Sequence, residues 1–555
     1  MSHLMNSRAG LVADAIEGEL RAAGGRLVRL DGFPDIRVVL RKDWDRSKVA
    51  LVSGGGAGHE PAHAGFVGRG MLTAAVCGDV FASPSTEAVL AAILAVAGAP
   101  GVLLIVKNYT GDRLNFGLAA ERARALGVRA EMVIVSDDIA LPEVAQPRGI
   151  AGTLFVHKIA GHVAESGEDL DTVAAAGRAA AGATRSIGMA LSTCTVPGQR
   201  AESRLAEGEA ELGLGIHGEP GAERAAVGTA RDIVATMLDR LGVAADHGPF
   251  ALLVNNLGGL PPVELAVVTD AVLAALGPKV NLLLGPSHMM TSLDMKGFSL
   301  SLLPLNADRH AALTAPTEAR GWPIATAPVA PEVLPLPEHT HEDGSSGSRS
   351  VSAGPATDEA ARNVIAAVLE TLIGQEEALN RLDRKVGDGD TGSTVARAAR
   401  SLSIGLDALV RSSWGETLLG IGHQAGKAMG GSSGVVASIF LAAAGSALLK
   451  GVTWSEALRA GFERVSFYGG AHEGERTMLD ALGPAIRALE KGETLAAAAK
   501  AAEEGARSTA DIIRTTAGRS SYLKADDLRG VPDPGAVATA AVFASLARVS
   551  SVEER

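Results

Sequence analysis

The chain has 555 residues, 47% of them hydrophobic, which is long enough for two to four domains that each bury a core. Its formal net charge of −12 and its 3% of aromatic residues disfavour nucleic acid as a partner. The two cysteines, Cys77 and Cys194, form no C-x-x-C pattern, and the first ten residues carry no apolar signal core. We therefore expect a cytoplasmic protein.

One stretch could suggest a membrane segment. The nineteen residues from Ala88 to Val106 carry no charge. The sequence Gly-Ala-Pro-Gly at 98–101 interrupts this stretch in the middle, and a membrane helix needs an unbroken apolar run. We expect a helix followed by a buried strand, and no membrane association.

Short apolar runs alternate with helical patterns through the first half of the chain. Buried strands are predicted at 49–56, 101–108, 130–136, 250–256 and 280–285, and helices at 117–127 and 263–277. This alternation predicts an α/β domain with a largely parallel sheet. Ligands of such sheets lie beyond the carboxyl ends of the strands.

Two polar, glycine-bearing loops follow the first two of these strands. One contains Gly56, Ala57, Gly58 and His59, and the other extends from Lys107 to Asp112. A single loop of this kind is usually ordinary turn chemistry. Two such loops at matching strand ends favour a site whose His, Lys and Asp side chains hydrogen-bond a small polyol or ketose.

His217 lies in a glycine-rich segment, ELGLGIHGEPG at 211–221. The letters GLGIHG match the dinucleotide fingerprint G-x-G-x-x-G, but we predict no strand before them and no helix after them, so we reject that reading. A lone histidine is more often structural than catalytic. A neutral imidazole in a tight glycine loop can nevertheless act as a nucleophile toward a carbonyl group.

Four segments of this half, 53–85, 106–119, 149–165 and 215–221, resemble the DhaK domain of dihydroxyacetone kinases. The resemblance implies that His217 forms a covalent hemiaminal with the ketone of dihydroxyacetone. It also implies that the loop of Gly56, Ala57, Gly58 and His59 holds the substrate together with Lys107 and Asp112, and that His59 is an acid/base residue. Whether His59 or Asp112 takes the proton of the substrate hydroxyl stays open.

A proline-rich and then Ser/Gly-rich stretch divides the chain. Five prolines lie between Pro323 and Pro337, and HTHEDGSSGSRSVSAGPA follows. Such a composition is typical of a flexible linker. We predict a ketose-binding domain at 1–335, a linker at 336–357 and a second domain at 358–555.

The second half has helical periodicity almost throughout. Helices are predicted at 358–383, 393–412, 415–429, 434–449, 454–465, 477–490, 494–509 and 534–549. Strand signals are nearly absent, so an all-α domain of about eight helices is expected. It contains no Walker A motif, since GHQAGKA lacks the required Gly and Ser/Thr.

The most informative segment of this half is 382–394, LDRKVGDGDTGST, with Asp383, Asp388 and Asp390 among glycines. Clustered carboxylates repel one another unless a cation lies between them, and Mg²⁺ is commonly held by carboxylates together with substrate phosphates. GDGDTG also matches G-x-G-x-x-G, but its aspartates would repel phosphates and a helix, not a strand, precedes it. A solvated acidic turn is the remaining alternative.

This half resembles the DhaL domain, the nucleotide-binding partner of DhaK and a barrel of antiparallel helices. The resemblance implies that Asp383, Asp388 and Asp390 bind two Mg²⁺ ions that hold ATP. The phosphate-binding residues that it implies are Thr391, Gly392, Ser393, Thr394, Ser432 and Ser433. The adenine- and ribose-binding residues that it implies are Gly469, Met478, Arg519, Asp533, Pro534 and Gly535.

Both resemblances together imply an ATP-dependent dihydroxyacetone kinase. They further imply a homodimer in which the ATP domain of one chain faces the ketose domain of the other. Three alternatives stay open: a kinase of a longer ketose such as erythrulose, a lyase that converts FAD to cyclic FMN, and a non-enzymatic ketose-sensing regulator. The intact aspartate cluster disfavours the regulator, because a sensor needs no metal site.

Overall fold

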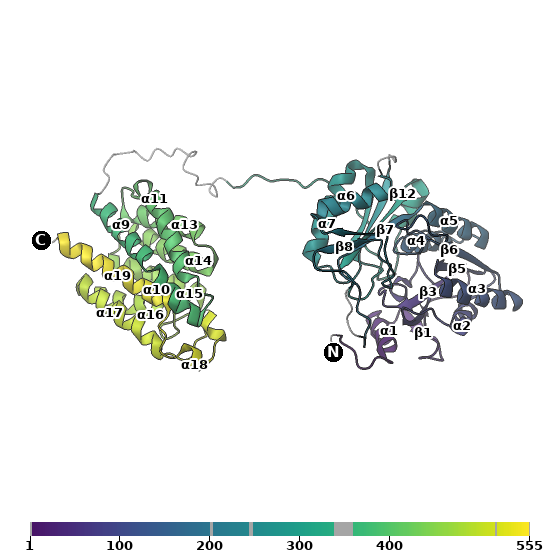
Figure 1. The fold of residues 1–555 in the computed structure, drawn as a ribbon, viewed down its shortest axis with the longest axis horizontal. Helices are drawn as coiled ribbons and strands as arrows, with labels where there is room; N and C mark the ends of the chain where they lie inside the picture. Colours follow the sequence, from purple (N-terminus) through teal and green to yellow (C-terminus); the bar gives the residue numbers. More distant parts are fainter. Residues whose placement is uncertain (1–2, 200–203, 244–247, 338–358, 517–518, 554–555) are drawn as a thin grey trace. The chain divides into compact units, whose positions relative to one another are not determined.

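The computed structural model describes residues 3–199, 204–243, 248–337, 359–516 and 519–553. The chain divides into two compact units, Met1–Pro335 and Leu336–Arg555, whose elements are labelled in Figure 1. The predicted linker at 336–357 lies outside the described residues except for 336 and 337, so its character stays a prediction. Each unit is considered by itself below.

The first unit contains two six-stranded sheets. In the first sheet the strand order is β1-β2-β4-β3-β5-β6, and in the second it is β11-β10-β12-β7-β8-β9. The strands are β1 Leu27–Arg29, β2 Val38–Arg41, β3 Ala50–Ala57, β4 Ala74–Val80, β5 Val102–Lys107, β6 Ala130–Val135, β7 Arg185–Ala190, β8 Glu209–Leu212, β9 Glu223–Ala226, β10 Phe250–Asn256, β11 Val280–His288 and β12 Gly297–Pro304.

Helices cover both faces of each sheet, because the central strands are apolar on both sides. Along β5, Val102 and Leu104 pack into one hydrophobic cluster with α2 and α3, while Leu103 and Ile105 pack into another with α4 and α5. The second cluster continues onto one face of the second sheet, and α6 and α7 cover the other face. The helices are α1 Leu11–Ala22, α2 Thr86–Val96, α3 Thr110–Ala125, α4 Thr153–Glu165, α5 Leu170–Ala183, α6 Ala230–Arg240, α7 Pro262–Leu276 and α8 Ala307–Thr314.

The expectation of a largely parallel sheet is right for the first sheet and wrong for the second. Strands β4, β3, β5 and β6 run parallel, whereas in the second sheet only β10 and β11 do. Strands β8 and β9 pair antiparallel on either side of the loop at 213–222, and β12 pairs antiparallel with both β10 and β7. Antiparallel neighbours need no crossover helix, so helix–strand alternation is lost there.

The second unit is a closed barrel of helices, as expected. Contacts run in a ring from α9 through α11, α13, α14, α15, α16, α17 and α19 back to α9, and α10 packs against α11 and α19. The α-helices are α9 Glu359–Gly374, α10 Glu376–Val386, α11 Thr391–Ile404, α12 Leu406–Leu409, α13 Trp414–Ala428, α14 Gly431–Leu448, α15 Trp454–Gly469, α16 Leu479–Glu490, α17 Leu495–Ser508, α18 Ala525–Leu528 and α19 Pro534–Glu553. The predicted helix at 358–383 is in fact two, α9 and α10, separated at Gln375.

Within the described residues, no helix is long and apolar enough to cross a membrane. The uncharged stretch from Ala88 to Val106 forms most of α2 and β5, which the interruption at 98–101 predicts. Strand β5 is buried inside the first sheet, and α2 packs on one face of that sheet.

Candidate functional site

The topology of the first sheet brings the two glycine-bearing loops together. Strands β3 and β5 are parallel neighbours, with Ala50 opposite Val102 and Ser53 opposite Ile105. Their carboxyl ends therefore meet at one edge, where β3 ends at Ala57 and β5 ends at Lys107. The sequence-predicted residues of both loops lie at this edge.

The structure places His59 against His217, although 158 positions separate them in the sequence. Their Nε2 atoms are 3.0 Å apart. His59 is fully buried, and its Nδ1 lies 2.7 Å from the carbonyl oxygen of Thr291, which follows β11. Burial, together with the charges of Lys107 and His217, lowers the pKa of His59 well below its usual value. His59 therefore releases a proton readily.

Lys107 and Asp112 lie beside this histidine pair, flanking Gly55. A Cβ atom at Gly55 would lie 3.4 Å from Lys107 Nζ and 3.5 Å from Asp112 Oδ2. Both side chains are buried, and Ser83 donates a hydrogen bond from Oγ to Asp112 Oδ1. Burial lowers the pKa of Lys107, against the opposing effect of Asp112. The edge of the sheet thus gathers an acid, an ammonium group and two imidazoles.

Aromatic rings enclose His217. Its ring centroid lies 4.6 Å from that of Tyr109 and 5.1 Å from that of Phe81, both in edge-to-face geometry. The Phe81 ring also leaves no room for a side chain at position 58, because a Cβ atom at Gly58 would lie 2.7 Å from Phe81 Cε1. Gly58 has a φ of 99°, so glycine is required there on both grounds.

Sequence reasoning missed four residues of this site: Phe81, Tyr109, Glu219 and Thr291. Glu219 contacts His217 twice, since Oε1 lies 2.9 Å from Nδ1 and Oε2 accepts the backbone N–H of His217 at 3.0 Å. The H-x-E spacing in GIHGEPG is the signal that points to this contact. Burial alone would raise the pKa of Glu219, but the hydrogen bond and charge of His217 outweigh it and lower this pKa to about 2.

The loop that carries His217 is held by contacts other than Glu219. Arg148 donates to the carbonyl oxygen of Gly213 at 2.7 Å and is ion-paired with Asp138. Ser292 donates from Oγ to the carbonyl oxygen of Ile216. Strand β8 ends at Leu212 directly before this loop, so our expectation that no strand precedes it is wrong.

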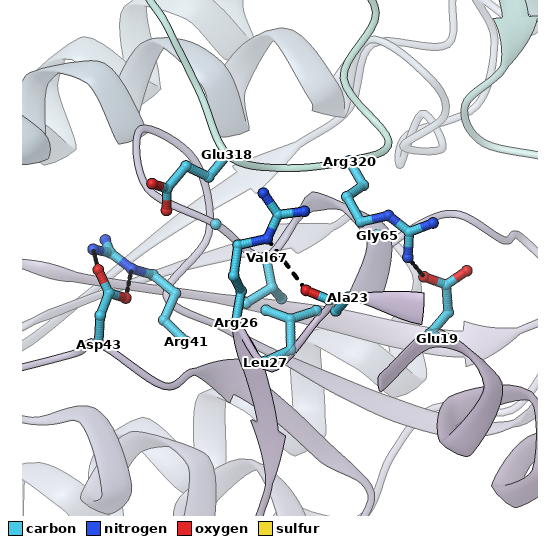
Figure 2. A pocket seen from close by; sticks show the side chains of 11 residues that line it. Glu19, Ala23, Arg26, Leu27, Arg41, Asp43, Gly65, Val67, Glu318 and Arg320 are labelled. Carbon is cyan, nitrogen blue, oxygen red and sulfur yellow. Dashed lines mark hydrogen bonds and ion pairs between the residues drawn. The ribbon is translucent and has the colours of Figure 1, made fainter. Parts of the chain in front are cut away.

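A separate narrow crevice in the same unit lies between α1, β1, β2 and the segment at 318–320. Figure 2 shows that its charged side chains pair along its walls, including Arg41 with Asp43 and Arg320 with Glu19. None of the sequence-predicted site residues lines it. The pair of Arg320 with Glu19 joins α1 to the segment near the end of the unit.

In the barrel, the acidic loop between α10 and α11 brings its three aspartates together. One carboxylate oxygen from each of Asp383, Asp388 and Asp390 lies within 4.8 Å of the others. Asp383 is buried, and its Oδ2 accepts the backbone N–H groups of Gly389, Asp390 and Thr391 at 2.9–3.1 Å. The other two carboxylates are exposed. Three convergent oxygens of this kind fit a hard divalent cation.

The predicted phosphate-binding residues occupy two helix N-termini. Thr391, Gly392, Ser393 and Thr394 form the first turn of α11, where Asn380 binds both the backbone N–H and the hydroxyl of Ser393. Ser432 and Ser433 lie exposed in the first turn of α14. The helix dipole favours anions at such positions.

The predicted adenosine-binding residues lie around the helix ends nearby. Ser432 and Gly469 line one hollow of about 570 Å³ together with apolar residues of α14 and α15. A Cβ atom at Gly535 would lie 3.7 Å from the backbone nitrogen of Met478, which brings the start of α19 to the start of α16. The side chain of Arg519 lies outside what the structure describes.

A buried guanidinium organises the segments next to this region. Arg476 is 2% exposed and donates to the backbone carbonyl groups of Thr509, Ile512, Leu528 and Val531. The structure thereby joins the end of α17 to the segment that leads into α19. Sequence reasoning did not identify Arg476, because its partners are backbone atoms that no motif records.

Asp533 stands before α19, where its Oδ1 accepts the backbone N–H of Ala536 at 2.7 Å. Burial raises the pKa of Asp533 to about 7, although this hydrogen bond and the charge of Arg476 oppose the rise. Pro534 is the first residue of α19, a position that suits proline because its missing N–H would have no partner inside the helix.

Comparison with known proteins matches one family domain to each half of the chain. Residues 22–321 match the Dak1 domain, and residues 385–548 match the DAK2 domain. The chain is 47% identical to the dihydroxyacetone kinase of Citrobacter freundii over 98% of both chains. It is 42% identical to the human triokinase/FMN cyclase, again over 98% of both.

A solved structure supports the same assignment. The dihydroxyacetone kinase of C. freundii in complex with AMP-PNP and Mg²⁺ superimposes with a TM-score of 0.83 and 46% identity, and 99% of each chain is covered. Both domain models, the relatives and this structure agree over nearly the whole length. The chain therefore belongs to the dihydroxyacetone kinase family, with a Dak1 domain and a DAK2 domain in one polypeptide.

Proposed function

We propose that this protein phosphorylates dihydroxyacetone with ATP, and that it holds the ketone as a covalent hemiaminal on His217. The observation that carries the proposal is the imidazole pair of His59 and His217 beside Lys107 and Asp112 at one sheet edge. A nucleophile next to an acid/base group is the arrangement that carbonyl addition needs. The matching kinase of C. freundii supports the substrate.

Within the first unit, each side chain then has a defined task. His217 supplies the nucleophilic nitrogen and His59 the proton for the ketone oxygen. Lys107 and Asp112 bind the hydroxyl groups and hold the reactive one in place, which is where positioning contributes most to the rate. Glycerol has no carbonyl group and cannot form this bond, so covalent capture distinguishes the ketose from the polyol.

In the barrel, Asp383, Asp388 and Asp390 are the residues that fit Mg²⁺, since their oxygens converge and are of the hard type that this ion prefers. When bound, Mg²⁺ neutralises the charge on the transferred phosphoryl group. The first turns of α11 and α14 offer hydroxyl groups and the positive end of the helix dipole to the phosphates. The number of ions, which we expect to be two, belongs to this proposal.

Turnover measured as ADP release tests the proposal. We expect rapid release with dihydroxyacetone, ATP and Mg²⁺, and none above background with glycerol. His217→Ala should lower kcat/KM for dihydroxyacetone by about 10³-fold or more, on the scale at which lost nucleophiles act. Unchanged kinetics in this variant would exclude the covalent role, and turnover on glycerol would exclude selection by covalent capture.

A second activity is suggested by the human relative, whose name combines a triokinase with an FMN cyclase. Conversion of FAD to cyclic FMN would use the nucleotide site alone. It should therefore survive His217→Ala and disappear in Asp388→Ala. The assay is chromatography of FAD incubated with the protein and a divalent cation. In the kinase assay, a preference for erythrulose over dihydroxyacetone would change the substrate and keep the mechanism.

We further propose that the protein acts in the cytoplasm as a homodimer, with the barrel of one chain serving the ketose site of the other. This arrangement follows from the family resemblance alone. It has a specific test with mixed dimers, which is given in the Discussion.

A further inference from the structure

The hydrogen bonds of His217 determine which of its ring nitrogens carries hydrogen. Nδ1 faces Glu219 Oε1 at 2.9 Å, and the second carboxylate oxygen already accepts the backbone N–H of the same histidine. An ionised carboxylate can only accept hydrogen bonds. The hydrogen in this contact is therefore on Nδ1, and in the neutral ring Nε2 carries the lone pair and faces the site.

The same reasoning applies to His59. Its Nδ1 faces the carbonyl oxygen of Thr291 at 2.7 Å, and a carbonyl oxygen can only accept. Both Nε2 atoms would then present lone pairs to each other across 3.0 Å. Two lone pairs do not form a hydrogen bond, so this contact requires one proton between the two nitrogens.

We propose that Glu219 is a positioning residue that fixes the tautomer of His217, so that Nε2 is the nucleophile, and that the ketone oxygen receives the proton shared by the two imidazoles. This inference rests on the hemiaminal proposed above. Glu219 makes no contact with the reacting carbon in this scheme. It acts through the Nδ1–H of His217.

Atoms and charges balance in this step. When the shared proton is on Nε2 of His59, the Nε2 lone pair of His217 is free to form the C–N bond, and the π electrons of the carbonyl move to oxygen. That oxygen takes the proton from Nε2 of His59, so His59 ends neutral. The ring of His217 ends as a cation that still donates Nδ1–H to Glu219, and the carboxylate now balances this positive charge. Release of the sugar reverses each transfer.

Several contacts besides this carboxylate hold the loop in its shape. Arg148 binds the carbonyl oxygen of Gly213, Ser292 binds that of Ile216, and the rings of Tyr109 and Phe81 pack on the imidazole. A change of the Glu219 side chain therefore alters the hydrogen bond to Nδ1 while these anchors remain. This makes a role in the tautomer separable from a role in folding.

Glu219→Gln is the decisive variant because glutamine has one acceptor and one donor where glutamate has two acceptors. If the amide oxygen keeps the backbone N–H of His217, its NH₂ group donates to Nδ1 and forces hydrogen onto Nε2. We expect kcat/KM for dihydroxyacetone to fall about 10²–10⁴-fold, the range seen when a histidine in an enzyme is held in the wrong tautomer. Glu219→Asp retains two acceptors and should lie closer to the wild type.

Two controls accompany this variant. Glu223→Gln is a matched change four residues further on, where an exposed carboxylate pairs with Arg240, and it should leave kcat/KM unchanged. Affinity of the full-length variant for ADP with Mg²⁺ reports on the barrel and should equal that of the wild type. Wild-type kcat/KM in Glu219→Gln would overturn the inference.

The tautomer itself is measurable in the wild-type protein, so the inference stays testable if a variant fails to fold. The chain has 13 histidines, and ¹⁵N labelling of histidine with His217→Ala as the subtraction control assigns the resonances of His217. We expect hydrogen on Nδ1 in the free protein; hydrogen on Nε2 alone would overturn the inference. If His217→Ala itself retained ketone capture, the hemiaminal proposal would fail instead, which is a distinguishable result.

Discussion

At the scale of single residues, Asp383 combines two tasks that its neighbours do not share. It is one of three carboxylates that converge, yet it is buried and accepts three backbone N–H groups at the start of α11. Its carboxylate therefore accepts backbone N–H groups at the N-terminus of α11, and its negative charge also attracts a cation. Asp388 and Asp390 are exposed.

This difference predicts distinct phenotypes for two isosteric changes. Asp383→Asn and Asp388→Asn should both abolish Mg²⁺-dependent phosphoryl transfer. Only Asp383→Asn should also destabilise the barrel, by about 1–3 kcal/mol, since a neutral amide oxygen replaces a carboxylate that accepts three N–H groups. Calorimetry of the full chain measures the stability. Equal unfolding temperatures for the two variants would contradict a structural role of Asp383.

Asp533 makes stability depend on pH in a predictable direction. Burial raises its pKa from 3.8 to about 7, so the folded chain holds a proton between about pH 4 and pH 7 that the unfolded chain releases. The stabilisation is complete below pH 4 and is lost as pH rises to about 7. We expect Asp533→Asn to remove about 1–3 kcal/mol of the change in unfolding free energy with pH. This figure is smaller than the full pKa shift implies, because the side chain of Asp533 is partly exposed.

Thermal unfolding of wild type and Asp533→Asn at pH 5 and pH 8 measures the effect. The variant should be the more stable protein at pH 8, and its advantage should be smaller at pH 5, where the stabilisation of the wild type is only partly lost. Asparagine retains an oxygen that accepts the N–H of Ala536. Parallel changes in both proteins would show that folding does not raise the pKa of Asp533.

At the scale of elements, the guanidinium of Arg476 holds two segments together by binding their backbone carbonyl groups. Two of these carbonyl groups lie at 509–512, after α17, and two lie at 528–531, before α19. A planar fork with five N–H donors can serve several acceptors at once, whereas an ammonium group acts as a single point. The segments next to the nucleotide residues are thus held by one side chain.

We predict that Arg476→Lys costs about 2–4 kcal/mol, because it leaves buried carbonyl groups without partners. Hydrogen exchange should accelerate at 509–512 and 528–531, and affinity for ADP should fall. The control is Arg459→Lys, whose guanidinium pairs with Glu490 nearer the surface and should cost less than about 1 kcal/mol. Equal exchange rates in both variants would exclude the organising role of Arg476.

At the scale of the whole molecule, the ketose site and the nucleotide residues belong to different compact units. The proposed dimer lets a barrel serve the ketose site of the other chain. His217→Ala and Asp388→Ala are each inactive alone under this proposal. Mixed dimers would join one intact ketose site to one intact barrel.

An equal mixture of the two variants, dissociated and reassembled, should recover about a quarter of wild-type activity, since half of the dimers are mixed and each has one complete pair. Sedimentation of the wild type measures the oligomeric state independently. Absence of recovery in a mixture shown to contain mixed dimers would mean that each barrel serves its own chain.

Much of the architecture was predictable because it depends on local periodicity. Apolar runs at 101–106 and 250–254 mark buried strands, and the 3.6-residue period marks the helices of the barrel. The antiparallel character of the second sheet was not predictable in this way. It depends on the pairing of β12 with β10 and β7, which is long-range.

We could predict from the residues alone an α/β half and a helical half, the acidic loop, and the candidate residues His59, Lys107, Asp112 and His217. These follow from composition, periodicity and motifs, which are local properties of the chain. The three-dimensional structure was needed to show that His59 faces His217, that the carbonyl group of Thr291 faces the ring of His59, and that Arg476 joins two segments. The physical reason is that these contacts connect residues far apart in the chain or use backbone atoms, and neither leaves a mark in a local pattern.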